Sequence, residues 1–340
     1  MNKKLDPSVT ILDVAREAGV SYSTVSRVLS GYEFVKETTR QKVMEAVERL
    51  GYVANQQARS LAGGKSRVIG LLVPGLDNGY IGEIARGIDE ELSRFEYDLL
   101  LYTTHRDKGK EASYSVRLAK GLADGLLLVV PFLTNTYTET LKAQNFPYVL
   151  IDQIDPAAQS SSVECTNWQG AYDLTRYLIE LGHTRIGFIT GLMGLRNAVD
   201  RLEGYRAALL DSGIPYIPEL VQEGDYWKDG GYQAASKLLN LAKRPTAIFA
   251  SNDLSAFGAM EAVRTHGLHI PNDISIVGFD DIPQASLVYP QLTTVRQPLD
   301  QMGRVGARLL IDQIEDPERP LRQVVLSTQL IVRDSCRSLK

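Results

Sequence analysis

Polar side chains that could hold a carbohydrate follow several strand-like segments of this chain. Carboxylates can accept hydrogen bonds from paired sugar hydroxyls, an arginine can donate to a ring oxygen or an anion, and aromatic rings can stack on a sugar's C–H faces. In an open parallel sheet such groups meet beyond the carboxyl ends of the strands, where ligands bind. The sequence therefore predicts a small-molecule site made by Asp77, Tyr80, Asp152, Arg201, Tyr226, Trp227, Asn252, Asp253 and Asp280.

Other interpretations of these residues stay open at this point. Asn252, Asp253 and Asp280 could cap helices that follow their strands, and Arg201 could pair with a neighbouring carboxylate on the surface. Several acids at strand ends favour a neutral, polyol-type ligand over an anion.

Catalysis is not expected. Asp280 and Asp281 are adjacent, so their side chains leave a strand end in different directions, and no Ser/His/Asp arrangement supports them. Cys165 and Cys336 stand in no C-x-x-C or Cys/His cluster. We expect no catalytic residue, no metal, no disulfide and no cofactor.

Short apolar runs alternate with amphipathic segments through most of the chain. This rhythm predicts an α/β fold with parallel sheets covered on both faces. A polar connection at 159–162 separates two similar lobes, and the expected strands are 68–73, 98–102, 125–130, 148–151, 186–190, 247–250 and 275–277.

The first thirty residues predict a helix, a tight turn and a second helix. Thr10 can cap the first helix together with Asp13, Gly19 allows the left-handed backbone that ends it, and Ser21 can cap the second. Any two short helices joined by Ala-Gly-Val would share this pattern.

One side of the second helix carries residue types that contact DNA. Val25, Val28 and Leu29 point inward, which leaves the other face exposed. Hydroxyl, aromatic and guanidinium groups can contact bases and phosphates. The exposed residues are Tyr22, Ser23, Ser26 and Arg27.

Charge supports a nucleic-acid partner for this end of the chain. Residues 1–67 carry eleven Lys and Arg against seven Asp and Glu, whereas the remainder carries 26 against 34, for a net charge of -4. A basic head on an acidic body is typical of a module that neutralises phosphates.

The segment 9–30, VTILDVAREAGVSYSTVSRVLS, closely resembles the DNA-binding head of the lac repressor and purine repressor family of transcription regulators. Two departures stand out: Lys36 replaces a frequent capping residue, and 77–81 lacks the frequent Asn-Pro-Phe-Phe pattern. Further motifs that resemble the family follow in family order at 39–43, 50–55, 182–189, 201–206, 250–253, 270–281 and 292–298.

The resemblance implies a domain organisation. It implies a helix-turn-helix head at 1–54, a hinge at 55–64 and an effector-binding body at 65–340 that is similar to periplasmic sugar-binding proteins. The first lobe would comprise about 65–161 and 292–321, and the second about 162–291 and 322–340.

The resemblance also implies roles for residues. Arg201, Asn252, Asp253 and Asp280 match the family's effector-binding motifs. Thr10 and Ser21 join the predicted DNA contacts, and the hinge would order on operator DNA with Leu61 wedged into the minor groove. A flexible linker is the alternative for the hinge, whose predicted DNA contacts are Asn55, Ala58 and Leu61.

The resemblance implies a dimeric transcription regulator that acts as a repressor. It would bind a pseudo-palindromic operator under the control of a sugar. The lac repressor's leucine-rich tetramer tail is missing after residue 335, which favours a dimer. Alternatives are a purine- or metabolite-responsive regulator, a solute-binding protein, and an enzyme acting on the sugar. No signal peptide and no 18-residue apolar stretch occur, so we expect a cytoplasmic, nucleoid-associated protein without membrane contact.

Overall fold

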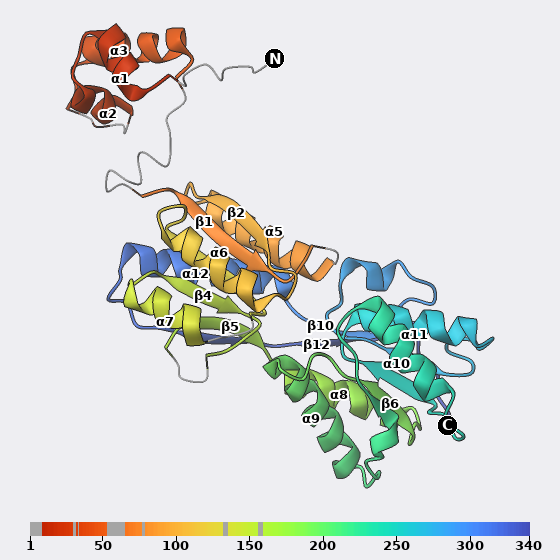
Figure 1. Cartoon of the computed structure of the whole chain (residues 1–340). Coiled ribbons are helices and arrows are strands. Elements are labelled where there is room, and N and C mark those ends of the chain that lie inside the picture. Colours follow the sequence, from red (N-terminus) through yellow and green to blue (C-terminus); the bar gives the residue numbers. More distant parts are fainter. Residues whose placement is uncertain are drawn as a thin grey trace. The chain divides into compact units, whose positions relative to one another are not determined.

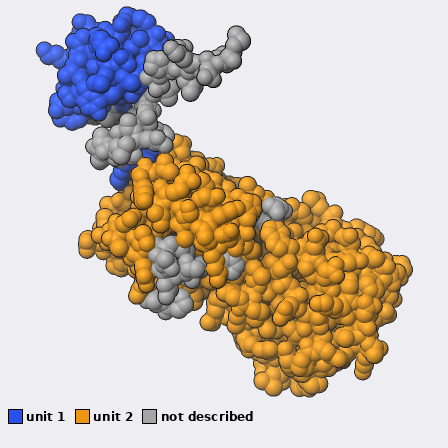
Figure 2. Space-filling model, viewed as in Figure 1, with its two compact units in different colours: residues 1–66 blue, residues 67–340 orange. Residues whose placement is uncertain are grey.

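The chain consists of two compact units. The computed structural model describes residues 9–29, 32, 34–52, 65–76, 79–131, 135–155 and 159–340. The units are residues 1–66 and 67–340, here called the head and the body (Figures 1 and 2). None of the described helices is long and apolar enough to cross a membrane.

The head is a bundle of three helices around a small apolar core. The helices are α1 (Ile11–Ala18), α2 (Tyr22–Leu29) and α3 (Glu37–Leu50). Each helix contributes fully or almost fully buried residues, because its apolar side chains recur on one face. The buried core consists of Val14, Ala15, Val25, Val28, Val43 and Ala46.

Local sequence signals set the ends of these helices. The Asp13 carboxylate accepts the Thr10 backbone N–H at 3.0 Å and the Thr10 hydroxyl at 2.7 Å. Gly19 ends α1 at φ 66°, and Ser21 Oγ accepts the Thr24 N–H at the start of α2. Lys36 precedes α3 and makes no capping hydrogen bond with any described residue. The expected helix-turn-helix therefore forms, and the weak cap is where the sequence predicted it.

A six-stranded parallel sheet organises the first lobe of the body. Its order is β11-β5-β4-β3-β1-β2. The strands are β1 (Val68–Val73), β2 (Asp98–Thr103), β3 (Gly125–Val129), β4 (Tyr148–Ile151), β5 (Ser161–Cys165) and β11 (Gln323–Leu326).

Helices cover both faces of this sheet. The strand period of two sends Ile69 and Leu71 toward α5 (Gly79–Ser93) and α12 (Leu299–Glu315), and sends Leu72 toward the other face. That other face packs on α6 (Lys108–Ala119) and α7 (Asn135–Ala143).

A four-stranded parallel sheet organises the second lobe, in the order β7-β6-β8-β9. Helices α8 and α9 pack on one face, and α10 and α11 pack on the other. The elements are β6 (Ile186–Ile189), β7 (Val221–Gln222), β8 (Ala247–Ala250), β9 (Ser275–Val277), α8 (Asn167–Glu180), α9 (Arg196–Asp211), α10 (Lys228–Leu239) and α11 (Asp253–Thr265).

Short elements complete this lobe. The strands β10 (Thr294–Arg296) and β12 (Gln329–Ile331) pair antiparallel. Isolated parallel bridges join Val277 to Thr293 and Asp280 to Arg296, beside the end of β9. Two short 3-10 helices span Pro218–Leu220 and Pro283–Ser286.

The lobe boundaries differ from those that we expected. The chain was predicted to leave the first lobe near 161 and to return to the second near 322, but β5 and β11 are hydrogen-bonded into the first sheet. Ser161 and Ser162 looked like a polar connection, yet both are fully buried. Ser161 Oγ accepts hydrogen bonds from Gln313 and from the Arg322 backbone, and these partners are more than 150 residues away.

Candidate functional site

The exposed face of α2 carries the side chains predicted to contact DNA. Tyr22 is 47% exposed, Ser23 and Arg27 are exposed, and Ser26 is half-buried. The Arg27 guanidinium carbon lies 5.7 Å from the centre of the Tyr32 ring. This face offers hydroxyl, phenol and guanidinium groups together, which is the chemistry that base edges and phosphates accept.

Thr10 and Ser21 are exposed, but their side chains are engaged in capping. The Thr10 hydroxyl donates to Asp13, and the Ser21 hydroxyl lies 2.9 Å from that of Ser23 and 2.8 Å from that of Thr24. Helix N-termini also present free backbone N–H groups that bind phosphate. Three predicted hinge contacts, Asn55, Ala58 and Leu61, lie outside the described residues, as does Asp77.

A cavity of about 40 Å³ lies between the two lobes of the body. Residues just beyond the carboxyl ends of strands in both sheets line it, as the geometry of parallel sheets predicts. The lining residues are Pro74, Tyr80, Ile81, Arg106, Val130, Asp152, Asn197, Arg201, Tyr226, Trp227, Asn252, Leu254, Asp280 and Ile282.

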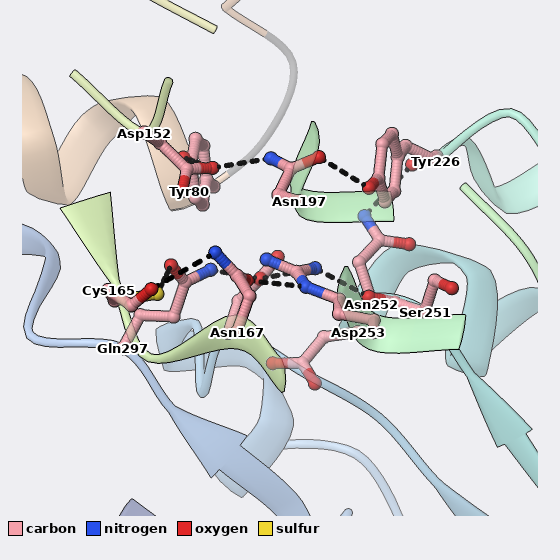
Figure 3. A network of polar contacts seen from close by, with 12 residues as sticks. Tyr80, Asp152, Cys165, Asn167, Asn197, Tyr226, Ser251, Asn252, Asp253 and Gln297 are labelled. Atoms are coloured by element: carbon pink, nitrogen blue, oxygen red, sulfur yellow. Dashed lines mark hydrogen bonds and ion pairs between the residues drawn. The ribbon is translucent and has the colours of Figure 1, made fainter. Parts of the chain in front are cut away.

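A chain of hydrogen bonds crosses the cavity from one lobe to the other (Figure 3). In the first lobe, the Tyr80 hydroxyl donates to Asp152 Oδ2 at 2.7 Å. Asn197, in the first turn of α9, donates to the same oxygen at 2.7 Å and accepts from the Tyr226 hydroxyl at 2.9 Å. These four side chains therefore link the lobes directly.

Arg201 lies at the floor of the cavity and is 1% exposed. Its Nε donates to Asn167 Oδ1 at 2.8 Å, and its Nη1 donates to the Ser251 carbonyl at 2.6 Å. Nη1 also lies 3.5 Å from Asp280 Oδ1. The guanidinium carbon is 3.9 Å from the centre of the Phe279 ring, so the cation is held by charge, hydrogen bonds and an aromatic face.

Gln297 contacts the same oxygen of Asp280 as Arg201 does. Its amide donates to Asp280 Oδ1 at 2.6 Å and its carbonyl oxygen accepts from the Cys165 thiol at 2.8 Å. Figure 3 shows Gln297 and Cys165 beside one another in this second row of contacts.

Burial dominates the electrostatics of the site. It raises the pKa of Asp280 to about 7, although Arg201 and Gln297 act in the opposite direction. Burial also raises the pKa values of Tyr80 and Tyr226 above the ordinary range. For Arg201, burial alone would lower the pKa, but neighbouring acidic groups outweigh it, so this side chain stays a cation.

Several lining residues adopt left-handed backbone that side chains seldom take. The φ angle is 56° at Arg106, 46° at Val130, 54° at Asp152, 71° at Tyr226 and 119° at Asp280. Such conformations cost about 1–3 kcal/mol each and persist only where the surrounding fold holds them. The fold thus stabilises an unfavourable backbone in order to direct side chains into this cavity.

Three side chains at the cavity present polar atoms without a protein partner. The buried atoms without a hydrogen-bond partner among the described residues are Asp152 Oδ1, Arg201 Nη2, and Nε and Nη1 of Arg106. The first is an acceptor and the others are donors. Within the same described ranges, no group of His, Cys, Asp or Glu could hold a metal ion.

The chain matches two family models. Residues 10–55 match the model for bacterial regulatory proteins of the lacI family, and residues 175–336 match a periplasmic binding protein-like domain. Catabolite control protein A of Priestia megaterium is 39% identical over 304 residues, which cover 89% of this chain and 92% of that protein. The chain belongs to the LacI family.

Solved structures of LacI-family regulators share its fold. The transcriptional regulator CelR in complex with cellobiose is 34% identical, with a TM-score of 0.75 over 96% of this chain and 99% of that one. The lac repressor dimer bound to operator and an anti-inducer is 29% identical, with a TM-score of 0.84 over 97% and 100%. The predicted family, the helical head and the α/β body are confirmed, and the protein is a transcriptional regulator.

The cavity of this LacI-family member brings together most of the predicted ligand-binding residues. Among the described residues, only Asp253 of the predicted set is absent from its lining. The residues brought together are Tyr80, Asp152, Arg201, Tyr226, Trp227, Asn252 and Asp280.

Asp253 was predicted to contact the effector, and this prediction needs correction. Its side chain is fully buried, and its two carboxylate oxygens accept the Ile282 N–H at 2.9 Å and the Thr294 hydroxyl at 2.6 Å. Asp253 thus ties α11 to the segments around β10 and does not line the cavity.

Asn252 caps a helix, as one of the two interpretations of the sequence predicted, and it also lines the cavity. Its Oδ1 caps α11 by accepting the Ser255 N–H, and its Nδ2 donates to the Tyr226 carbonyl while the residue lines the cavity. Arg201 pairs with Asp280, which excludes the surface ion pair considered from sequence.

Sequence reasoning missed two polar residues of the cavity, Arg106 and Asn197. Arg106 comes three residues after β2 ends, so the same strand-end rule that selected Asp152 would have found it. Asn197 gave no such signal, because it lies within α9 next to the more conspicuous Arg196.

Proposed function

We propose that the protein is a homodimeric repressor that binds a pseudo-palindromic operator and is controlled by a sugar in the interlobe cavity. The unpaired acceptor Asp152 Oδ1 and the unpaired donor Arg201 Nη2 carry the sugar assignment, because both are buried at the cavity. A sugar hydroxyl is at once donor and acceptor and could satisfy both atoms.

Aromatic side chains support the same ligand class. Tyr80, Tyr226 and Trp227 line the cavity together with the polar groups. Their ring faces can stack on the C–H faces of a pyranose while the hydroxyls meet the polar groups.

Ligand binding requires rearrangement of the cavity. Pockets for small molecules typically have volumes of about 300–1,000 Å³, whereas this cavity has about 40 Å³. The bond between Asn197 and Asp152 crosses the space that a sugar would occupy. We infer that the effector replaces this bond and changes the angle between the lobes.

Control of DNA binding would follow from that change. A ligand shifts an equilibrium only by its unequal affinity for two states, and coupling between sites is typically about 1–3 kcal/mol. In our proposal the lobes alter the spacing of the two hinges in a dimer, and Leu61 of each hinge wedges into the operator only in one state. A protein with this target acts at the bacterial nucleoid.

The proposal is tested by titrating the full-length protein onto labelled duplexes. A pseudo-palindrome selected from random oligonucleotides is expected to bind more tightly than its scrambled version at moderate salt, with two protein chains per duplex. Sugars from a thermal-shift panel are then added. A sugar that binds tightly but leaves operator affinity unchanged would contradict the coupling, and a monomer without preference for palindromes would contradict the whole proposal.

Nucleobases are a second effector class for the panel. The rings of Tyr226 and Trp227 could stack on a base as well as on a sugar. A purine that raises the unfolding midpoint more than every sugar would favour this alternative.

A further inference from the structure

Arg106 is a cation at the cavity that has no counter-ion in the described structure. It follows β2 and precedes α6, and it lines the interlobe cavity on the side of the first lobe. Its Nε and Nη1 are buried, and neither has a hydrogen-bond partner among the described residues. The centre of the Tyr226 ring is 5.9 Å from its guanidinium carbon.

The carboxylates of the cavity make their contacts with other residues. Asp152 Oδ2 accepts from Tyr80 and from Asn197, and Asp280 Oδ1 is held by Arg201 and by an amide. Asp152 Oδ1 has no partner among the described residues, so it does not bind Arg106 either.

The carboxylate of Asp225 interacts electrostatically with Arg106 and favours its charged form. Its Oδ1 accepts the Trp227 backbone N–H at 2.9 Å, and within the described part of the chain it forms no ion pair with Arg106. Burial consequently lowers the pKa of the Arg106 guanidinium from its ordinary value, although an arginine stays protonated at neutral pH.

Arg106 is partly exposed, but its buried Nε and Nη1 are costly without a partner, and a neutral hydroxyl would remove only part of that cost. A hydroxyl can accept a hydrogen bond from Nε or Nη1, but it leaves the charge uncompensated. A carboxylate or phosphate compensates the charge and can accept two parallel N–H bonds from the planar guanidinium.

The backbone that carries Arg106 is itself held in an unfavourable conformation. His105 and Arg106 have φ angles of 52° and 56°, and the Thr103 hydroxyl lies 3.1 Å from His105 Nε2. Two consecutive left-handed residues are unusual outside glycine. This turn places the guanidinium at the cavity instead of in solvent.

We propose that the effector is an anionic sugar, one that bears a carboxylate or a phosphate, and that Arg106 binds this group. The inference rests on the sugar-responsive function proposed above and specifies the ligand class of the same cavity. The anionic group lies at the end of β2, while hydroxyls of the sugar meet Asp152 and Arg201. This assignment differs from the neutral polyol that the sequence favoured, because Arg106 adds a cation to the acids of the site.

Matched pairs of ligands test the charge requirement. Isothermal titration of the full-length protein in phosphate-free buffer compares galacturonate with galactose, cellobionate with cellobiose, and glucose 6-phosphate with glucose. At least one anionic member is expected to bind about 10- to 100-fold more tightly than its neutral partner, the range of a hydrogen bond between charged groups. The first two pairs report a carboxylate and the third a phosphate.

Two substitutions separate charge from fold. Arg106→Gln is expected to abolish the preference for the anionic member over its neutral partner, measured as the ratio of the two affinities. Arg106→Lys keeps the charge but loses the planar fork, so it is expected to retain part of the preference. Because Arg106→Gln removes an unpaired cation, the ligand-free variant is expected to unfold at a higher temperature than the wild type.

Each result bears on the proposal. Equal affinity for charged and neutral members, or a preference that survives Arg106→Gln, would overturn the anionic assignment and leave the sugar effector standing. Failure of all six sugars to bind would overturn both. A lower unfolding temperature for ligand-free Arg106→Gln would mean that the guanidinium has an internal partner, and the inference would fall on that result alone.

Discussion

Replacing Asp280 with asparagine is expected to flatten the pH dependence of the body's stability. Burial raises the pKa of Asp280 to about 7 from an ordinary value of 3.8. The folded protein therefore retains a proton that the unfolded chain has already released. A carboxyl with a raised pKa contributes its full stabilisation below the unfolded value, and this contribution is lost as pH rises through the folded value, so the window is roughly pH 4 to 7.

The magnitude follows from the size of the pKa difference. About three units at about 1.4 kcal/mol per unit give about 4 kcal/mol of unfolding free energy lost across this window. Asp253 is also buried and its pKa is raised, first by burial and then by Asp280. The variant keeps Asp253 but removes a charge that raises its pKa, so the difference between the two pH profiles reports the Asp280 carboxyl together with its effect on Asp253.

Urea unfolding of the full-length protein at pH 4.5, 6 and 7.5 measures this difference. The only two tryptophans, Trp168 and Trp227, both lie in the second lobe and report its unfolding by fluorescence. The wild type is expected to lose about 3 kcal/mol more than Asp280→Asn between pH 4.5 and 7.5, because part of the loss occurs below this range. Parallel profiles for the two proteins would refute the reasoning.

A second variant checks the direction of the effect. Arg201 lies 3.5 Å from the Asp280 carboxylate and lowers its pKa. In Arg201→Met the window is expected to extend above pH 7, because the carboxyl has lost this cation. A window that stays in place or moves to lower pH would show that Arg201 does not stabilise the ionised carboxylate.

Three further outcomes follow from the head, the hinge and the helix packing. Arg27→Ala is expected to cost about 1–3 kcal/mol of operator affinity and to relax sequence preference; unchanged competition by random DNA would reduce Arg27 to a phosphate contact. Leu61→Gly is expected to weaken specific binding and DNA bending while non-specific affinity remains, as measured by gel shift and circular permutation of the site. Gly87→Ala would place a Cβ 1.9 Å from the Asp300 carbonyl oxygen, so we expect about 1–3 kcal/mol of destabilisation or more in urea. Its control, Gly82→Ala in the same helix, meets nothing within 4 Å and is expected to stabilise by about 0.5–1 kcal/mol.

Local patterns in the sequence were sufficient to predict many of the helices and strands. The apolar run at 68–73 forms β1 over the same residues, and Gly19 ends α1 with the left-handed backbone that its lack of a Cβ allows. Such signals depend on neighbours a few residues away, so they can be recognised without knowledge of the tertiary structure.

The sequence did not predict pairing between segments that lie far apart in the chain. Ser161 looked like part of a polar loop because its hydrogen-bonding partners lie in α12 and before β11. Without those partners, a buried serine-rich strand cannot be distinguished from a solvated connection.

The residues of the candidate site were likewise predicted only in part, because local sequence gave their positions but not their contacts. Strand-end position alone selected Asp152, Asp253 and Asp280 equally, and only packing turned Asp253 away from the cavity toward Thr294. Arg106 was overlooked, although its position just after β2 follows the same strand-end rule.

The sequence by itself thus determined the family, the head, the alternation of apolar strands with helices, and the edge of the sheets where polar groups gather. The tertiary structure decided which of those groups face the cavity, which are satisfied by other protein atoms, and which remain without a partner. The physical reason is that hydrophobic periodicity and helix caps are local, whereas burial and hydrogen-bond satisfaction depend on segments that meet only when the chain has folded.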